Sequence, residues 1–131
     1  MLTVLSVFGT RPEVIKIAPL LRAFEAHTPA IRSVTCATGQ HRQMLDQALA
    51  LFDVKPDYDL GVMQADQSLA GLTASLLSGL ERVVSTVQPD WILAVGDTTT
   101  VLAASLIAYY HRVRFGHVEA GLRTGDRFNP Y

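Results

Sequence analysis

The chain has 131 residues, of which 49% are hydrophobic and 18% are charged, and its formal net charge is −1. This length and composition are typical of one globular domain with a sizeable core. A nearly neutral charge gives no reason to expect nucleic acid or an anionic membrane as a partner. The single cysteine, Cys36, excludes an internal disulfide and fits a reducing compartment. No apolar run is long enough to span a membrane, and the first one lacks the basic leader of a signal peptide, so we expect a cytoplasmic protein.

The first expected element is an apolar strand over residues 2–8, which turns into a helix. Thr10 and Glu13 have the spacing of a capping box, whereas Pro12 suits the first position of a helix. The residue before a proline avoids helical dihedrals. We therefore expect Arg11 to be the N-cap residue and Pro12 the first helical one.

Arg11 places a positive charge at the positive end of the expected helix dipole, which is unfavourable for stability. A guanidinium beside Gly9 and free backbone N–H groups would be favourable if an anion such as a phosphate binds there. The alternative is that Arg11 pairs with Glu13. The residues of this turn favour neither interpretation over the other.

The remaining elements follow from hydrophobic spacing and turn residues. The apolar face of the first helix continues across Pro19, which predicts one kinked helix rather than two. Cys36 lies in the next strand, where a buried small hydrophobe is the expected role. The patterns predict, in chain order, a strand over 31–37, a helix after residue 41, a short strand over 57–60, a long helix from the N-cap Ser68 to near Pro89, a wholly apolar strand over 91–95, a helix over 101–110 that is apolar almost all round and hence buried, and a strand over 113–118.

Strands that alternate with helices predict an α/β fold with a doubly wound parallel sheet. In the usual strand order 3-2-1-4-5, the chain reverses direction between the first and the fourth strand, and ligands of open sheets bind at this switch point. The loops after those two strands are residues 9–11 and 96–100. Glu119 follows the neighbouring strand at the same edge. The sequence therefore predicts a ligand crevice between these segments.

The side chains of this crevice suggest chemistry on an anionic leaving group. Neither G-x-G-x-x-G nor a P-loop is present, so dinucleotide and ATP-hydrolysing functions are disfavoured. The crevice would hold one cation (Arg11), two carboxylates (Asp97 and Glu119), a histidine (His117) and several hydroxyls. A cation for a diphosphate and two carboxylates for proton transfer suit the elimination of a nucleoside diphosphate from a sugar.

Each of these residues also has a structural interpretation. Asp97 could cap the buried helix, and Thr98 could be a cap or turn residue rather than a phosphate contact. His117 and Glu119 are two positions apart, so on a strand they would face one side and could bind a metal together with Asp97. A structural histidine is the commoner case, and we expect no metal. Residues 40–43 could be an ordinary polar loop and first helical turn.

Four motifs occur in order and at matching separations, namely FGTRPE over residues 8–13, QHRQMLD over 40–46, GDTTT over 96–100 and HVEAGLRT over 117–124. Together they resemble the bacterial non-hydrolysing UDP-N-acetylglucosamine 2-epimerases, over essentially the whole chain. The resemblance implies the N-terminal Rossmann-like domain, residues 1–131, of a glycosyltransferase-B-like architecture with two such domains. It implies interconversion of UDP-N-acetylglucosamine and UDP-N-acetylmannosamine through a 2-acetamidoglucal intermediate, without metal or nicotinamide. It also implies a homodimer that serves polysaccharide biosynthesis.

The resemblance further implies roles for individual residues. Arg11 resembles the phosphate-contacting arginine of the family, and Asp97 and Glu119 resemble two of its catalytic acids. The other residues expected to contact the substrate lie in the same motifs: Gly9, Thr10, Thr98, His117 and Arg123. An activating second UDP-N-acetylglucosamine binds in some members at positions that correspond to Gln40, His41 and Gln43, although residues 65–67 lack an arginine that those members use.

Members of this family are much longer than the present chain. By resemblance, a further catalytic glutamate, a catalytic histidine and most of the uridine pocket lie beyond Tyr131. We therefore expect a folded domain that is catalytically silent by itself. Two alternatives are a hydrolysing relative that releases UDP and N-acetylmannosamine, and a stand-alone module that binds UDP-sugars.

Overall fold

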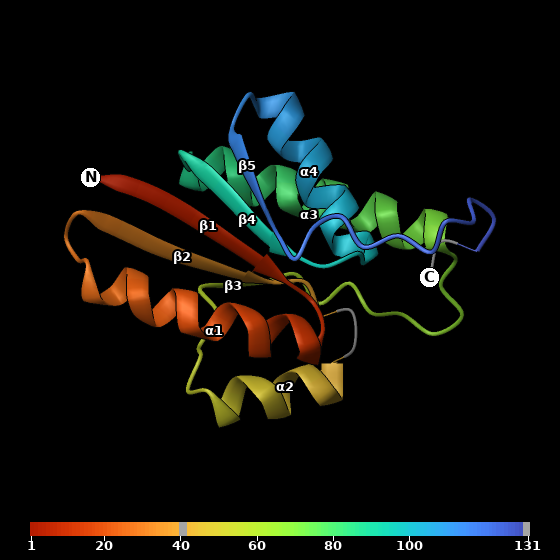
Figure 1. Ribbon diagram of the computed structural model, residues 1–131, viewed down its shortest axis with the longest axis horizontal. Helices are drawn as coiled ribbons and strands as arrows, with labels where there is room; N and C mark the ends of the chain where they lie inside the picture. Colours follow the sequence, from red (N-terminus) through yellow and green to blue (C-terminus); the bar gives the residue numbers. More distant parts are fainter. Residues whose placement is uncertain (40–41, 130–131) are drawn as a thin grey trace.

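The computed structural model describes residues 1–39 and 42–129 and has a parallel five-stranded sheet at its centre (Figure 1). The elements in chain order are β1 (Leu2–Phe8), α1 (Arg11–Ala26), β2 (Ile31–Ala37), α2 (Arg42–Leu51), β3 (Tyr58–Asp59), α3 (Leu69–Val87), β4 (Trp91–Val95), α4 (Thr99–His111) and β5 (Arg114–Val118). The strand order is β3-β2-β1-β4-β5. This order and the parallel pairing of all neighbours confirm the predicted doubly wound α/β class.

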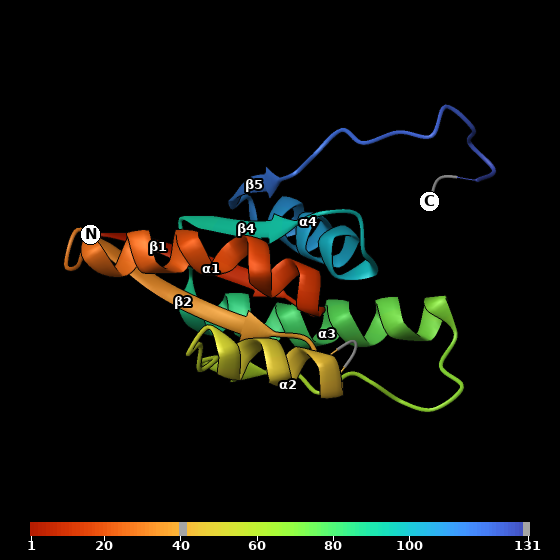
Figure 2. The ribbon, with the colours of Figure 1, turned by 60° about the horizontal axis from the view of Figure 1, so that its bottom comes forward.

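Helices cover both faces of the sheet, with α1 and α2 on one face and α3 and α4 on the other (Figure 2). Successive side chains of β1 point to opposite faces, as the pleat of a strand requires. Leu5 and Val7 pack in the cluster that α3 and α4 cover, whereas Phe8 packs against α1 and α2. This two-sided burial explains why β1 and β4 are almost wholly apolar in sequence.

The predicted long helix is α3, and its ends are as expected. The Ser68 hydroxyl caps the first turn by accepting a hydrogen bond from the Gly71 N–H at 3.0 Å. The helix ends at Val87, and Gln88 adopts a left-handed conformation just before Pro89. Within the described parts of the chain, no helix combines the length and the apolar character that crossing a membrane requires.

Some predicted boundaries and burial patterns are wrong. The strand predicted over 57–60 is only two residues long, and β5 begins at Arg114 rather than at residue 113. Helix α4 begins at Thr99 and is not buried all round, because Leu102, Tyr109 and Tyr110 are exposed. The buried apolar residues of α4 pack on α3 and the sheet. The helix has more apolar residues than this side can hold, so the remaining ones face solvent. Helix α1, by contrast, runs without a break through Pro19, as predicted.

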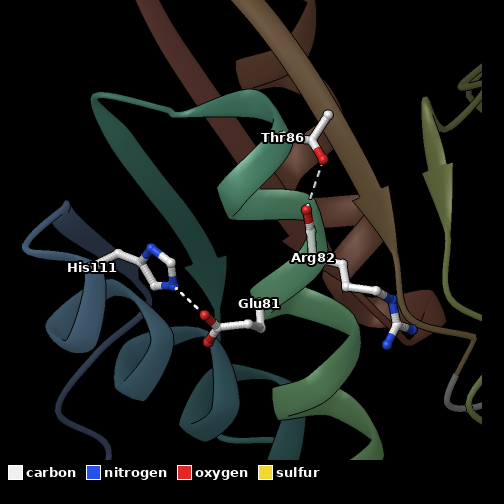
Figure 3. A network of polar contacts seen from close by, with 4 residues as sticks. All are labelled: Glu81, Arg82, Thr86 and His111. Carbon is white, nitrogen blue, oxygen red and sulfur yellow. Dashed lines mark hydrogen bonds and ion pairs between the residues drawn. The ribbon is translucent and has the colours of Figure 1, made fainter.

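One polar contact links α3 to α4 at their outer surface, and a second lies within α3 (Figure 3). His111 Nε2 and Glu81 Oε1 lie 3.0 Å apart and join the end of α4 to the middle of α3. Thr86 donates its hydroxyl hydrogen to the backbone carbonyl of Arg82 at 2.9 Å, one turn earlier in α3. The Arg82 side chain points away from the pair of His111 and Glu81. These contacts lie on the surface and involve none of the predicted site residues.

Cys36 is completely buried in β2. This confirms its predicted role as a small hydrophobic residue. Removal from water raises the pKa of the Cys36 thiol from its ordinary value of 9.0 to about 12, and the negative charge of Asp59 adds to the effect. The thiol is therefore neutral throughout the physiological pH range.

Candidate functional site

A buried glutamate organises the turn between β1 and α1. Glu13 is only 3% exposed, and its Oε2 accepts hydrogen bonds from the backbone N–H groups of Gly9 at 2.6 Å and Thr10 at 2.9 Å. The N-cap residue of α1 is Thr10, whose backbone is extended, so Arg11 and Pro12 occupy the first two helical positions. The prediction that Arg11 is the N-cap residue is therefore wrong by one position. The bond from the Thr10 N–H to Glu13 outweighs the weaker tendency of a residue before proline to avoid helical dihedrals.

The second carboxylate oxygen of Glu13 reaches the loop after β4. Thr98 donates its hydroxyl hydrogen to Glu13 Oε1 at 2.5 Å, between residues that are 85 positions apart in sequence. Thr98 is the N-cap residue of α4, but its side chain makes no capping bond to its own helix. Asp97 lies outside the cap position, which excludes the alternative interpretation of Asp97 as the cap of this helix. Among the described residues, Glu13 also forms no ion pair with Arg11, the alternative that the sequence left open.

A second buried contact joins the end of β2 to α4. The hydroxyls of Thr38 and Thr100 are fully buried and lie 3.1 Å apart. Thr38 is the first residue after β2, and its backbone N–H donates a hydrogen bond to the Phe8 carbonyl at 2.9 Å. The segments that follow β1, β2 and β4 are therefore held together at the carboxyl edge of the sheet, where the switch point was predicted.

Two of the charged side chains predicted for this crevice, Arg11 and Asp97, are exposed. Arg11 lines a hollow of about 340 Å³ between α1 and α2, together with Ile15 and Leu51. Asp97 follows Gly96, whose φ of 84° lies in the left-handed region that favours glycine. The structure thus brings the backbone segments of Arg11 and Asp97 to one edge of the sheet. It places the Arg11 side chain toward α2.

Glu119 does not lie on a strand, which corrects the reasoning about its orientation. Strand β5 ends at Val118, and Glu119 has a φ of 57°, so alternation along the strand no longer places its side chain on the same face as His117. The Glu119 carboxylate forms an ion pair with Lys16 of α1. Lys16 was not among the residues predicted from the sequence. Its only signal in the sequence is a cation in the second turn of the helix that leaves the switch point.

His117 binds the neighbouring loop instead of pairing with a carboxylate. Its Nε2 lies 2.5 Å from the Gly96 carbonyl oxygen. Because a carbonyl can only accept, Nε2 carries the hydrogen and Nδ1 is the atom that a neutral ring leaves as an acceptor. Across residues 1–39 and 42–129, no three His, Cys, Asp or Glu side chains gather in a way that could hold a metal ion.

The chain after β5 leaves the body of the fold. Figure 2 shows that residues 119–129 run away from the sheet and helices, and all of them are exposed. Arg123 lies in this segment and donates from Nη1 to the neighbouring Leu122 carbonyl at 2.7 Å. The predicted contact of Arg123 with the substrate stays a prediction. Further along, hydrogen bonds from Asn129 and Phe128 lower the pKa of Asp126.

The predicted activator positions can be located only in part. Gln40 and His41 lie outside the described residues. Gln43 is exposed in the first turn of α2. The other large hollow near α1, of about 520 Å³, lies at the opposite edge of the sheet and is lined by both cations, such as Arg32, and carboxylates, such as Glu25. It is therefore separate from the candidate site.

The carboxyl edge of the sheet carries four charged residues on neighbouring elements. Two are carboxylates, Asp97 and Glu119, and two are cations, Arg11 and Lys16. The carboxylates could transfer protons, and the cations could stabilise negative charge on a leaving group. The edge is open to solvent along its length, since all four of these residues are exposed.

Known proteins of one family are similar to the chain in sequence. A family model described as UDP-N-acetylglucosamine 2-epimerase matches residues 22–131. The UDP-N-acetylglucosamine 2-epimerases of Yersinia pestis and Escherichia coli K12 are 56% and 54% identical to the chain over 128 residues, which are 98% of this chain and 34% of each relative.

Solved structures of similar proteins share the fold. The crystal structure of the Neisseria meningitidis UDP-GlcNAc 2-epimerase bound to UDP-GlcNAc matches with a TM-score of 0.91 and 49% identity, over 99% of this chain and 35% of that one. The Methanocaldococcus jannaschii enzyme in complex with UDP-GlcNAc and UDP matches with a TM-score of 0.91 and 33% identity, over 98% and 35% of the two chains. The chain spans about a third of the length of these relatives and matches the N-terminal third of their glycosyltransferase-B-like structures. On this evidence, the chain belongs to the UDP-N-acetylglucosamine 2-epimerase family.

Proposed function

We propose that the chain provides the N-terminal wall of an active site that interconverts UDP-N-acetylglucosamine and UDP-N-acetylmannosamine. The proposal is supported by identities above 50% to epimerases over nearly the whole chain. It is supported as well by the ligands of two similar structures, one bound to UDP-GlcNAc and the other to UDP-GlcNAc and UDP. Residues 1–131 would then form a single Rossmann-like domain of a larger, dimeric cytoplasmic enzyme.

The observation that carries the proposal is the buried link between the two switch-point loops. Glu13 binds the β1–α1 turn through Oε2 and the β4–α4 loop through Oε1. The link fixes the loop of Arg11 relative to that of Asp97 at the edge where ligands of doubly wound sheets bind. Glu119 follows β5 at the same edge.

The reaction would proceed by elimination and re-addition. A carboxylate removes the proton at C2 of the sugar while the bond from C1 to the diphosphate oxygen breaks, and the C2–H electron pair forms the double bond of 2-acetamidoglucal. UDP then adds back to C1, and a proton is delivered to the other face of C2. Asp97 and Glu119 are the proposed acid and base. Arg11 would stabilise the negative charge of the departing UDP. The reaction requires no metal or nicotinamide.

The isolated chain would be folded but catalytically silent. Its candidate site has one wall, and charges that face water act in a high dielectric, where each contributes less than in a closed site. The weak binding of UDP that we expect would depend on Arg11 and would decrease as salt is added.

Calorimetric titration of UDP into the chain tests the assignment of Arg11. Arg11→Ala should weaken UDP binding with almost no change in the free energy of unfolding, because the side chain is exposed. Arg22→Ala removes the same charge from an exposed position further along α1 and is the matched control. Equal UDP affinity for Arg11→Ala and the unaltered chain would refute the contact.

NMR of reaction mixtures separates the candidate reactions. The chain should give no manno product from UDP-N-acetylglucosamine, whereas a longer family member should give UDP-N-acetylmannosamine with or without a chelator. Release of free N-acetylmannosamine and UDP would instead identify a hydrolysing enzyme. Turnover by the 131-residue chain at the rate of a longer enzyme would refute the one-wall proposal.

A further inference from the structure

We infer that Glu13 is a positioning residue that couples the loop of Arg11 to the loop of Asp97. The predicted effect on UDP binding rests on the proposed function. The coupling of the two loops rests only on the contacts of Glu13. The side chain is 3% exposed, so it cannot touch a ligand in the crevice. Apart from the through-space effect of its charge, any effect of Glu13 on ligand binding must therefore pass through the two loops.

The carboxylate is shared between two elements that are far apart in sequence. Oε2 accepts from the N–H groups of Gly9 and Thr10, and Oε1 accepts from the Thr98 hydroxyl. Hydrogen bonds to an ionised carboxylate are shorter and stronger than those between neutral groups. Within the part of the chain that the structure describes, Glu13 has no cation as partner, so these three donors are what stabilise its buried charge.

The contact exceeds what capping of α1 requires. A capping box needs one oxygen of the glutamate to accept the N-cap N–H, and Oε2 does this. Oε1 is bound instead by the N-cap residue of the other helix, and Thr98 makes no side-chain capping bond to α4. The N-cap residue of α4 is therefore bonded to Glu13 of α1, and displacement of either loop breaks a bond to a buried charge.

Thr98→Val tests the coupling without altering the bonds of Glu13 to its own turn. Valine has nearly the shape of threonine and lacks the hydroxyl, so the variant removes only the link between loops. We expect amide hydrogen exchange at Gly9 and Thr10 to accelerate about tenfold, since a hydrogen bond to a charged group is lost. Exchange in the central strand β1 should not change.

Two further variants complete this measurement. Thr98→Ser restores a hydroxyl and should return the exchange rates of Gly9 and Thr10 to those of the unaltered chain. Thr86→Val makes the same substitution at the exposed hydroxyl of α3 drawn in Figure 3 and is the matched control. Unchanged exchange at Gly9 and Thr10 in Thr98→Val would overturn the inference.

UDP titration then separates positioning from electrostatics by the direction of the effect. Glu13→Gln removes a negative charge near the proposed anion site, which by charge alone should tighten UDP binding. If Glu13 positions the loops, binding should weaken severalfold, and the same substitution should have little further effect in a Thr98→Val background. Equal or tighter binding by Glu13→Gln would refute the positioning role. If the unaltered chain binds no UDP, the proposed Arg11 contact fails, while hydrogen exchange still decides whether the loops are coupled.

Discussion

Lys16 of α1 forms an ion pair with Glu119, the first residue after β5. The pair links the helix that leaves the switch point to the segment that leaves the body of the fold. Glu119 has a left-handed backbone conformation, which costs a residue with a Cβ about 1 kcal/mol. A tertiary contact therefore helps to hold this residue in an intrinsically unfavourable conformation.

The ion pair should contribute little to global stability. The two side chains are 42% and 37% exposed, and pairs in contact with solvent contribute about 1 kcal/mol at most. Lys16→Met should therefore lower the free energy of unfolding by less than about 1 kcal/mol in urea titrations, while NMR relaxation should report a more mobile Glu119 amide. Lys55→Met, at another exposed lysine, is the control for the loss of one charge. A Glu119 amide that is equally rigid in Lys16→Met would contradict the positioning by Lys16.

The Cys36 thiol should be unreactive in the folded chain. Burial raises its pKa to about 12, and the thiolate is the reactive form. At pH 8, a thiol reagent such as DTNB should label the chain in urea but not in its absence. Because the folded state holds this proton more tightly than the unfolded state, the stabilising contribution is complete below pH 9 and is lost as the pH rises toward 12. Rapid labelling under native conditions would show that β2 opens readily.

Ser6 provides a test of an unpaired polar group. Its Oγ is buried in the middle of β1 and has no hydrogen-bond partner among the described residues. Burial of a hydroxyl without a partner is costly, so Ser6→Ala should leave the free energy of unfolding unchanged or raise it by about 1 kcal/mol. Thr38→Val, which removes a buried hydroxyl that is bonded to Thr100, should lower it by about 1 kcal/mol. A marked loss of stability in Ser6→Ala would reveal a partner for its hydroxyl.

Gly116 in β5 should not tolerate a side chain. A Cβ at this position would lie 2.3 Å from Cδ2 of Leu93 in the neighbouring strand β4. Gly116→Ala should lower the free energy of unfolding by about 1–3 kcal/mol, the usual cost of overpacking. In a Leu93→Ala background, where Cδ2 is absent, the same change should cost much less. Equal costs in the two backgrounds would mean that Leu93 is not the obstacle.

The sheet could be predicted from the sequence because each of its determinants is local. Apolar runs with turn residues between them are sufficient to place β1, β2 and β4, and the alternation with helices favours the strand order that the structure has. The cap of α3 at Ser68 is likewise a contact within one helical turn. Such features depend on residues that are neighbours in the chain.

The centre of the candidate site could be predicted only in part, because its contacts are tertiary. The spacing of Thr10 and Glu13 indicated one half of the arrangement, but nothing in the sequence paired Glu13 with Thr98. The orientation of Glu119 was misjudged because it was reasoned as a strand residue, whereas β5 ends at Val118 and the backbone turns to positive φ at Glu119. Lys16 was missed because a lone lysine on a helix is ordinarily only a solvated charge.

The sheet of the described residues ends at β5, whose outer backbone groups have no strand beside them. Open edges of this kind are templates for pairing between molecules. Tyr109 and Tyr110 of the adjacent α4 add exposed aromatic surface. Arg114 and His117 are the exposed polar residues of this strand, and the positive charge of Arg114 would oppose such pairing, because the same charge on a second molecule repels it. In concentrated samples the 131-residue chain should therefore remain dispersed more readily at low salt than at high salt, where this repulsion is screened.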